Sequence, residues 1–181
     1  MIEFMVDLET MGSGPTAAIV SIGCVPFDRE SLAVSQDEFY TVVDLESSLK
    51  AGLVAESSTI LWWMMQSEEA RTELFSGRRA QLYEALSALR YWMAGLVPAK
   101  NDRKVWGNGA AFDNVILSSA YKAVGLETPW NFWNDRCFST MKNEFADVPL
   151  PDRSGLHHKA VDDARYQAEC LVEILRSVRK R

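Results

Sequence analysis

The hydrophobic pattern of the first third of the chain predicts three β-strands. Apolar and polar residues alternate over residues 2–9, as in a strand with two different faces. Residues 17–25 form a largely apolar run rich in valine and isoleucine, and residues 38–45 alternate again. The links are short and the first contains the turn sequence GSGP, so we expect two antiparallel hairpin connections.

The rest of the chain predicts helices that alternate with short strands. Helical spacing of apolar residues is clearest at 79–96, and 111–124 follows a glycine turn as a second helix. This order predicts one α/β domain over residues 1–181, with a mixed sheet flanked by helices. The other expected elements are helices at 57–66, 67–75 and 160–178, strands within 103–109 and 130–138, and a loop at 148–158. In the helix at 111–124 we expect an inward face of Phe112, Val115, Ile116, Ser119 and Ala123.

The first strand carries two acids on one face. Alternation places Asp7 and Glu9 on the same side, opposite the apolar face that contains Phe4 and Val6. Two carboxylates so close together are unfavourable unless a positive charge lies near them. A solvated sheet edge and a metal site both explain the pair, and the remaining motifs have to separate these two interpretations.

Composition is that of a globular protein with an acidic surface. The chain has 48% hydrophobic and 24% charged residues and a formal net charge of −6. That charge argues against nucleic-acid binding, unless clustered acids hold cations that supply the positive charge at the site. The N-terminus lacks the basic segment of a secretory signal and no apolar run reaches ~18 residues, so we expect a cytoplasmic protein with no membrane contact.

Two further segments place acids where the fold does not require them. Asp113 begins a helix directly after a glycine turn, a position that the helix dipole also favours. Asp162 and Asp163 both lie in the first turn of the last helix. The helical faces predict that Asp162 is solvated and that Asp163 points inward, where it needs a partner. His158, in the preceding loop, is positioned to reach the same place.

These residues resemble the three motifs of the DEDDh superfamily of 3′–5′ exonucleases, which have an RNase H-like fold. The segments VDLET, NGAAFD and HHKAVDDA match those motifs, and the spacing of the third selects His158 over His157 and Asp163 over Asp162. Residues 59–75 are also similar to a branch of bacterial and phage 3′–5′ exoribonucleases and exonucleases. The resemblance therefore implies an RNase H-like mixed sheet and an enzyme from a bacterial cell or a phage.

The resemblance implies two-metal hydrolysis of a phosphodiester. Two divalent cations, Mg²⁺ or Mn²⁺, would clamp the attacking and leaving oxygens, and carboxylates suit such hard ions. Asp7 would bridge both metals, Glu9 and Asp163 would complete one site, and Asp113 would hold the second metal. His158 would act as the general base. The product would be a nucleoside 5′-monophosphate released from a free 3′ end.

The resemblance also suggests the substrate contacts and the partners. Thr10, Met11, Asn108 and Phe112 flank the motifs and are the expected contacts to a single strand of RNA or DNA. Met11 stands where the proofreading subunits often carry a second threonine. For Trp62, Trp63 and Trp106, core packing is favoured over base stacking, and of the adjacent pair one is expected in the core and the other at the cleft or a partner subunit.

Several alternatives remain open at this point. Arg153 is either a phosphate contact or a solvated loop residue. The sugar of the substrate is undecided, because no motif reports a contact to the 2′-hydroxyl. A polymerase proofreading subunit and an inactive nucleic-acid-binding relative are the rival functions, and relatives leave room for a homodimer.

Overall fold

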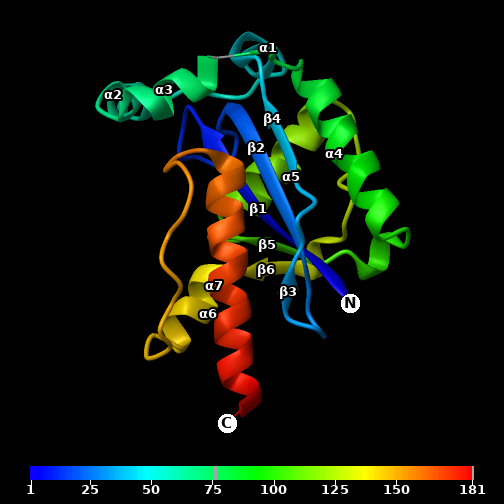
Figure 1. The fold of residues 1–181 in the computed structure, drawn as a ribbon. Helices are drawn as coiled ribbons and strands as arrows, with labels where there is room; N and C mark the ends of the chain where they lie inside the picture. The colour runs from blue at the N-terminus through cyan, green and yellow to red at the C-terminus, as the bar shows by residue number, and fades with distance from the viewer. Residues whose placement is uncertain (76, 181) are drawn as a thin grey trace.

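A mixed β-sheet with helices on both faces makes up the molecule (Figure 1). The computed structural model describes residues 1–75 and 77–180. Ser76 and Arg181, which the single-domain prediction includes, lie outside the described residues. The strands are β1 (Ile2–Thr10), β2 (Ile19–Asp28), β3 (Ala33–Val34), β4 (Phe39–Val42), β5 (Val105–Gly107) and β6 (Asp135–Cys137). The helices are α1 (Leu45–Lys50), α2 (Ser57–Met64), α3 (Glu68–Phe75), α4 (Leu82–Leu96), α5 (Asp113–Ala123), α6 (Phe138–Glu144) and α7 (Ala160–Lys180), and short 3₁₀ turns lie at Lys100–Asp102 and Phe132–Asn134.

The strand order is β3-β2-β1-β5-β6, and β4 also pairs with β2. β2 is antiparallel to β1, β3 and β4, whereas β5 runs parallel to both β1 and β6. The predicted combination of antiparallel N-terminal strands with later parallel strands is therefore confirmed. Because β1, β5 and β6 are parallel, their carboxyl ends meet at one edge of the sheet, which is where the motif residues of β1 and α5 lie.

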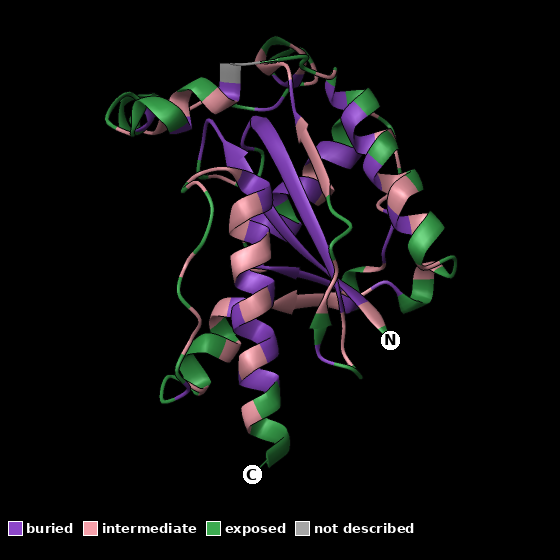
Figure 2. Ribbon diagram, viewed as in Figure 1, coloured by how far each residue is buried: buried purple, intermediate pink, exposed green. Residues whose placement is uncertain are grey.

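The sheet separates two hydrophobic cores, and β1 contributes to both. Phe4, Val6 and Leu8 pack in the core that contains residues of α4 and α5, whereas Met5 packs in the core beneath α7. Figure 2 shows β1 and β2 buried along their length, with α7 across the front. The predicted alternation is thus confirmed. The solvated-edge interpretation of Asp7 is wrong, because β1 lies inside the sheet with both faces covered.

Two local expectations are corrected. The strand predicted at 38–45 ends at Val42, because the Asp44 side chain accepts the Ser47 backbone N–H at 2.9 Å and starts a helix at Leu45. This capping contact favours the helix over a continued strand.

The inward face predicted for the helix at 111–124 is confirmed at Ile116 but wrong at its other positions, which are partly or fully exposed. Val115 is 38% exposed, and Ile116, Leu117, Ala120 and Tyr121 form the buried face instead. The buried face is rotated because Asp113 and Asn114 turn inward at the start of α5. Those two polar residues have specific partners near the sheet, and they set the orientation of the whole helix.

The long final helix was predicted at 160–178 and spans Ala160–Lys180. Its N-terminal turn lies directly over Gly23 of β2, where an added Cβ would lie only 2.2 Å from the carbonyl carbon of Ala160. Only glycine permits this contact between strand and helix backbones. Among the described residues, no helix is both long and apolar enough to cross a membrane.

Candidate active site

Four acids from three elements converge near the carboxyl ends of the central strands. Asp7 and Glu9 lie in the last four residues of β1, Asp113 begins α5, and Asp163 lies in the first turn of α7. Asp7, Glu9 and Asp113 are 8%, 7% and 2% exposed, respectively. Such burial of several like charges is unfavourable unless a cation or protons neutralise them.

Glycines allow the two helices to bring their acids this close. Gly107, at the end of β5, faces the start of α5, and a Cβ there would lie 2.8 Å from the Cβ of Asp113. Gly23 plays the same part beneath α7, and it is the residue paired with Asp7 across β1 and β2. The positions of Asp113 and Asp163 therefore depend on two sites without side chains.

The His158 side chain lies close to two of the acids, Glu9 and Asp163. Ligand atoms of Glu9, His158 and Asp163 all lie within 4.8 Å of one another, which is close enough for all three to contact one ion. His158 has a φ of +63°, a left-handed conformation that is uncommon for a residue other than glycine, and its backbone N–H donates to Asp163 Oδ2 at 3.3 Å. His157, the neighbour that the motif spacing rejected, is exposed.

Strained backbone conformations of this kind are most often found at functional sites. The preceding turn is also held in place: Asp162 Oδ2 accepts the Leu156 backbone N–H at 2.8 Å. The expectation that Asp162 is merely solvated is therefore wrong, because its carboxylate fixes the loop that carries His158.

The pKa values of the buried acids reflect their burial first and their closeness to one another second. Burial, together with the charges of Asp113 and Glu9, raises the pKa of Asp7 well above its ordinary value. Burial and the charge of Asp113 raise the pKa of Glu9 to about 8. Burial raises the pKa of Asp113 to about 6, although the backbone N–H of Gly109, 3.3 Å from Asp113 Oδ2, acts in the opposite direction. The site favours bound positive charge.

Glu3 is a buried acid of the same strand whose charge is balanced by neighbouring side chains. Its side chain is 1% exposed and on the same face as Asp7. It accepts the Trp106 indole N–H at 2.6 Å and lies 3.4 Å from Lys104 Nζ and 3.6 Å from Arg29 Nη1. Among the described residues, neither Asp7 nor Glu9 has such an ion pair.

Gln167 is a site residue that the sequence reasoning missed. Its Nε2 donates to Asp7 Oδ1 at 2.7 Å, and both side chains are buried. This hydrogen bond lowers the pKa of Asp7 and fixes the orientation of its carboxylate. Gln167 follows Asp163 by one helical turn, so the same-face rule for positions four apart could have marked it as a candidate, although not its contact with Asp7.

Two tryptophans of α2 surround the His158 ring. The ring centroids of Trp62 and Trp63 lie 4.9 Å and 5.9 Å from that of His158, both in edge-on arrangements. Burial lowers the pKa of His158, with smaller contributions from the charges of His157 and Arg153. A neutral imidazole held in this way is able to accept a proton.

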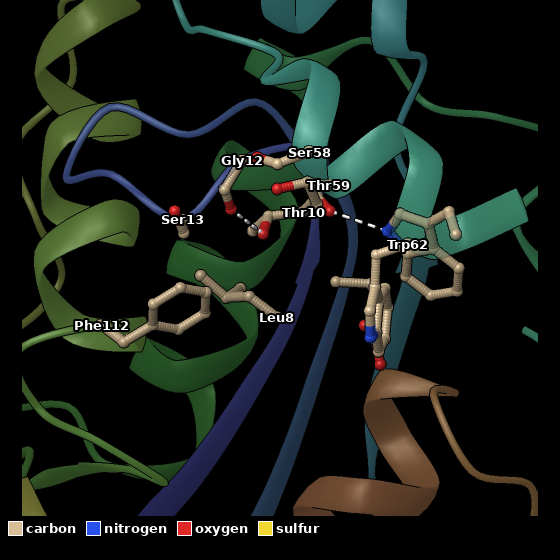
Figure 3. A pocket seen from close by; sticks show the side chains of 10 residues that line it. Leu8, Thr10, Gly12, Ser13, Ser58, Thr59, Trp62 and Phe112 are labelled. Carbon is tan, nitrogen blue, oxygen red and sulfur yellow. Dashed lines mark hydrogen bonds between the residues drawn. The ribbon is translucent and has the colours of Figure 1, made fainter. Parts of the chain in front are cut away.

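A pocket of about 390 Å³ opens beside Glu9 (Figure 3). Phe112 lies on one side and Trp62 on the other, with Leu8 and Thr10 between them. Trp63 is buried and donates its indole N–H to the Thr10 carbonyl at 2.9 Å, whereas Trp62 is 43% exposed. The expectation that one tryptophan of the pair is core and the other faces the cleft is confirmed.

Two of the four expected substrate contacts line this pocket. Thr10 and Phe112 do so, although the Thr10 hydroxyl donates to the Gly12 carbonyl at 2.6 Å. Met11 is 5% exposed and lines a separate apolar cavity with residues of α2 and α3. Asn108 is exposed and its carbonyl accepts the Ser139 backbone N–H at 2.8 Å. Trp106 is 4% exposed, which confirms core packing for that residue.

The mixed sheet and its flanking helices define a protein of the RNase H-like fold class. The chain belongs to the family of the 3′–5′ exoribonuclease Rv2179c-like domain, whose model matches residues 2–175. It is 28% identical to the exodeoxyribonuclease of Enterobacteria phage T4, over 83% of this chain and 78% of that protein.

Solved structures show the same fold. The nuclease domain of 3′hExo, a DEDDh family member bound to rAMP, matches with a TM-score of 0.66 and 16% identity, over 97% of this chain and 92% of that one. The zinc-bound complex of E. coli exonuclease I with single-stranded DNA matches with a TM-score of 0.60 and 13% identity, over 97% of this chain and 40% of that one.

Proposed function

We propose that this protein is a DEDDh-type 3′–5′ exonuclease that hydrolyses single-stranded nucleic acid from a free 3′ end to nucleoside 5′-monophosphates. The family match supports 3′–5′ exonuclease activity. The observation that carries the finer assignment is the convergence of four acids and one histidine, with carboxyl pKa values raised by burial and, for Asp7 and Glu9, by neighbouring acids.

The side chains fit two divalent cations. By the family resemblance, Glu9 and Asp163, which lie within reach of one ion, would hold it together with Asp7, and Asp7 and its neighbour Asp113 would hold the second; carboxylate oxygens are the ligands that Mg²⁺ and Mn²⁺ prefer. When bound, such ions activate water and neutralise the charge that develops on the phosphate. The ligand set suits Mg²⁺ and Mn²⁺ equally, since both take oxygen ligands.

His158 takes the part of general base. Its ring lies beside Glu9 and Asp163, where an attacking water would be, and the tryptophans of α2 restrict its orientation. Because its pKa is lowered, the imidazole is neutral at pH 7 and able to remove a proton from water. The proton passes to the ring nitrogen that faces the acids.

The pocket beside Glu9 suits the terminal nucleotide. Phe112 and Trp62 offer aromatic surfaces to a base, and stacking of this kind is tolerant of base identity. The family description names an exoribonuclease, whereas the phage relative is an exodeoxyribonuclease, so we propose single-stranded nucleic acid as the substrate class and leave the sugar to experiment. A homodimer and a bacterial cytoplasmic location stay predictions.

A time course with end-labelled single strands tests this function. RNA and DNA of equal sequence, labelled at the 3′ or the 5′ end, are incubated with Mg²⁺ or Mn²⁺. We expect early release of a labelled mononucleotide only from 3′-labelled strands, complete inhibition by EDTA, and no hydrolysis by Asp7→Asn. Cleavage that begins at the 5′ end, or that persists in EDTA, would exclude the proposal.

A further inference from the structure

Arg153 is a cation that contacts the acid cluster in this structure. It lies in the loop between α6 and α7, and its guanidinium forms an ion pair with Asp163 through Nη2 and Oδ1. The Arg153 charge also lowers the pKa values of Asp7 and Glu9. One guanidinium therefore acts on three of the four acids.

The environment of Arg153 differs from that of a structural arginine. Arg103 is 6% exposed, and its Nε, Nη1 and Nη2 donate to the carbonyls of Val97, Pro129 and Pro98, each at 2.7 Å. By contrast, Nε of Arg153 is buried and has no hydrogen-bond partner among the described residues. Arg153 is thus held mainly by charge, together with a cation–π contact in which its Cζ lies 5.1 Å from the Tyr166 ring centroid.

Arg153 and a divalent cation compete for the same carboxylate. Oδ1 of Asp163 contacts the guanidinium, and Asp163 is also one of the three residues whose ligand atoms lie within 4.8 Å of one another. A guanidinium and a metal ion that both contact the Asp163 carboxylate would repel each other strongly in a partly buried site. An ion bound by Glu9 and Asp163 therefore requires Arg153 to move away.

We propose that Arg153 is an internal counter-ion that occupies the acid cluster until a divalent cation displaces it, and that the displaced guanidinium then binds a phosphate of the substrate strand. The second step follows from position and chemistry: the guanidinium is released at the edge of the hydrolytic site, and its planar donors match phosphate oxygens. This inference rests on the proposed function for the identity of the substrate, but its first step concerns metal binding alone.

Direct Mn²⁺ titration without nucleic acid tests the first step. The wild type, Arg153→Gln and Arg153→Lys are compared by electron paramagnetic resonance or calorimetry. We expect Arg153→Gln to bind Mn²⁺ about two- to fivefold more tightly, as removal of a competing part-buried ion pair implies, and Arg153→Lys to stay nearer the wild type. Unchanged or weaker Mn²⁺ affinity in a folded Arg153→Gln would overturn the counter-ion role.

Arg165→Gln is the matched control. Arg165 lies on α7 close to the site but pairs with Glu38 at 2.7 Å and donates to the Ser35 carbonyl at 2.9 Å. Its loss removes an equal charge from a position two residues beyond Asp163, so we expect no change in Mn²⁺ affinity. A similar gain in both variants would show that overall charge, and not the contact with Asp163, sets the affinity.

Steady-state kinetics at saturating Mn²⁺ test the second step. We expect Arg153→Gln to raise KM for the labelled strand severalfold with a smaller change in kcat, and Arg153→Lys to restore part of the loss. An unchanged KM would remove the phosphate contact from the proposal. If the wild type binds Mn²⁺ but hydrolyses no strand, the proposed function fails while the titration still decides the counter-ion role.

Discussion

Replacement of Gly23 by alanine is expected to damage both stability and the active site. The new Cβ would lie 2.2 Å from the carbonyl carbon of Ala160 and 2.3 Å from both the Ala160 oxygen and the Val161 nitrogen. All three atoms belong to the backbone of α7, so no side-chain rotation relieves the clash. An ordinary contact needs at least 3.4 Å, and the first turn of α7 therefore has to move by more than 1 Å.

The magnitude follows from the packing of this contact. Overpacking of a well-packed interior typically costs about 1–3 kcal/mol, and we expect Gly23→Ala to lose that much free energy of unfolding. The effect on activity is expected to be larger. The displaced turn carries Asp163 and receives the His158 backbone N–H, and a shift of ~1 Å at a reacting centre can reduce turnover about 100-fold.

Urea denaturation and the labelled-strand assay measure the two effects. Gly95→Ala is the matched control, because Gly95 lies in α4 and a Cβ added there would have none of the described atoms beyond its own helix within 4 Å. The same chemical change there should stabilise the protein by about 0.5–1 kcal/mol through helix propensity and leave turnover unchanged. A Gly23→Ala variant with wild-type stability and turnover would refute the argument that this close contact positions α7.

Three further predictions concern the site itself. His158→Ala should lower kcat with little change in Mn²⁺ affinity, whereas His157→Ala should behave as the wild type; the reverse order would show that the wrong histidine was assigned. Gln167→Leu should weaken Mn²⁺ binding or turnover about 10- to 100-fold, because it frees the Asp7 carboxylate, and calorimetry with the nuclease assay would detect either loss. Without metal, the pKa of Glu9 is about 8 in the folded protein, against an ordinary 4.5 in the unfolded chain. The protonated Glu9 carboxyl therefore contributes to the free energy of unfolding in full below pH 4.5, and this contribution is lost as the pH rises to 8. The loss is at most ~5 kcal/mol, and Glu9→Gln should flatten that part of a urea-denaturation pH profile.

The sequence predicted the fold well where residue patterns are strictly local. Alternation along residues 2–9 placed Phe4 and Asp7 on their correct faces, and the apolar spacing located the final helix to within two residues of its end. The prediction of secondary structure failed where a polar side chain caps a helix or rotates it about its axis. Asp44 starts a helix inside the predicted third strand, and Asp113 rotates α5 by drawing its first turn inward.

The sequence was sufficient to single out the acids of the candidate site, but not the residues that contact and orient them. Asp7, Asp113 and Asp163 stand out because each breaks an otherwise structural pattern. Gln167 does not break one, since a polar residue on the margin of an amphipathic helix is ordinary, and only the structure shows its contact with Asp7. The same holds for Trp62, whose contact with the His158 ring joins positions ninety-six residues apart.

Glu3 and Glu9 are buried on one strand in two different electrostatic environments. Both lie on the same face of β1, and both are buried. Glu3 accepts a hydrogen bond from the Trp106 N–H and lies near two cations. The structure is therefore able to bury a carboxylate together with positive charge from its own side chains. Around Glu9 it instead assembles more acids, and the arginine that contacts Asp163 is held mainly by charge. The free energy of unfolding falls as the clustered carboxyl groups lose their protons, and a cation that binds the folded state raises it again. The cluster therefore has the charge balance expected of a site in which an exchangeable ion replaces Arg153.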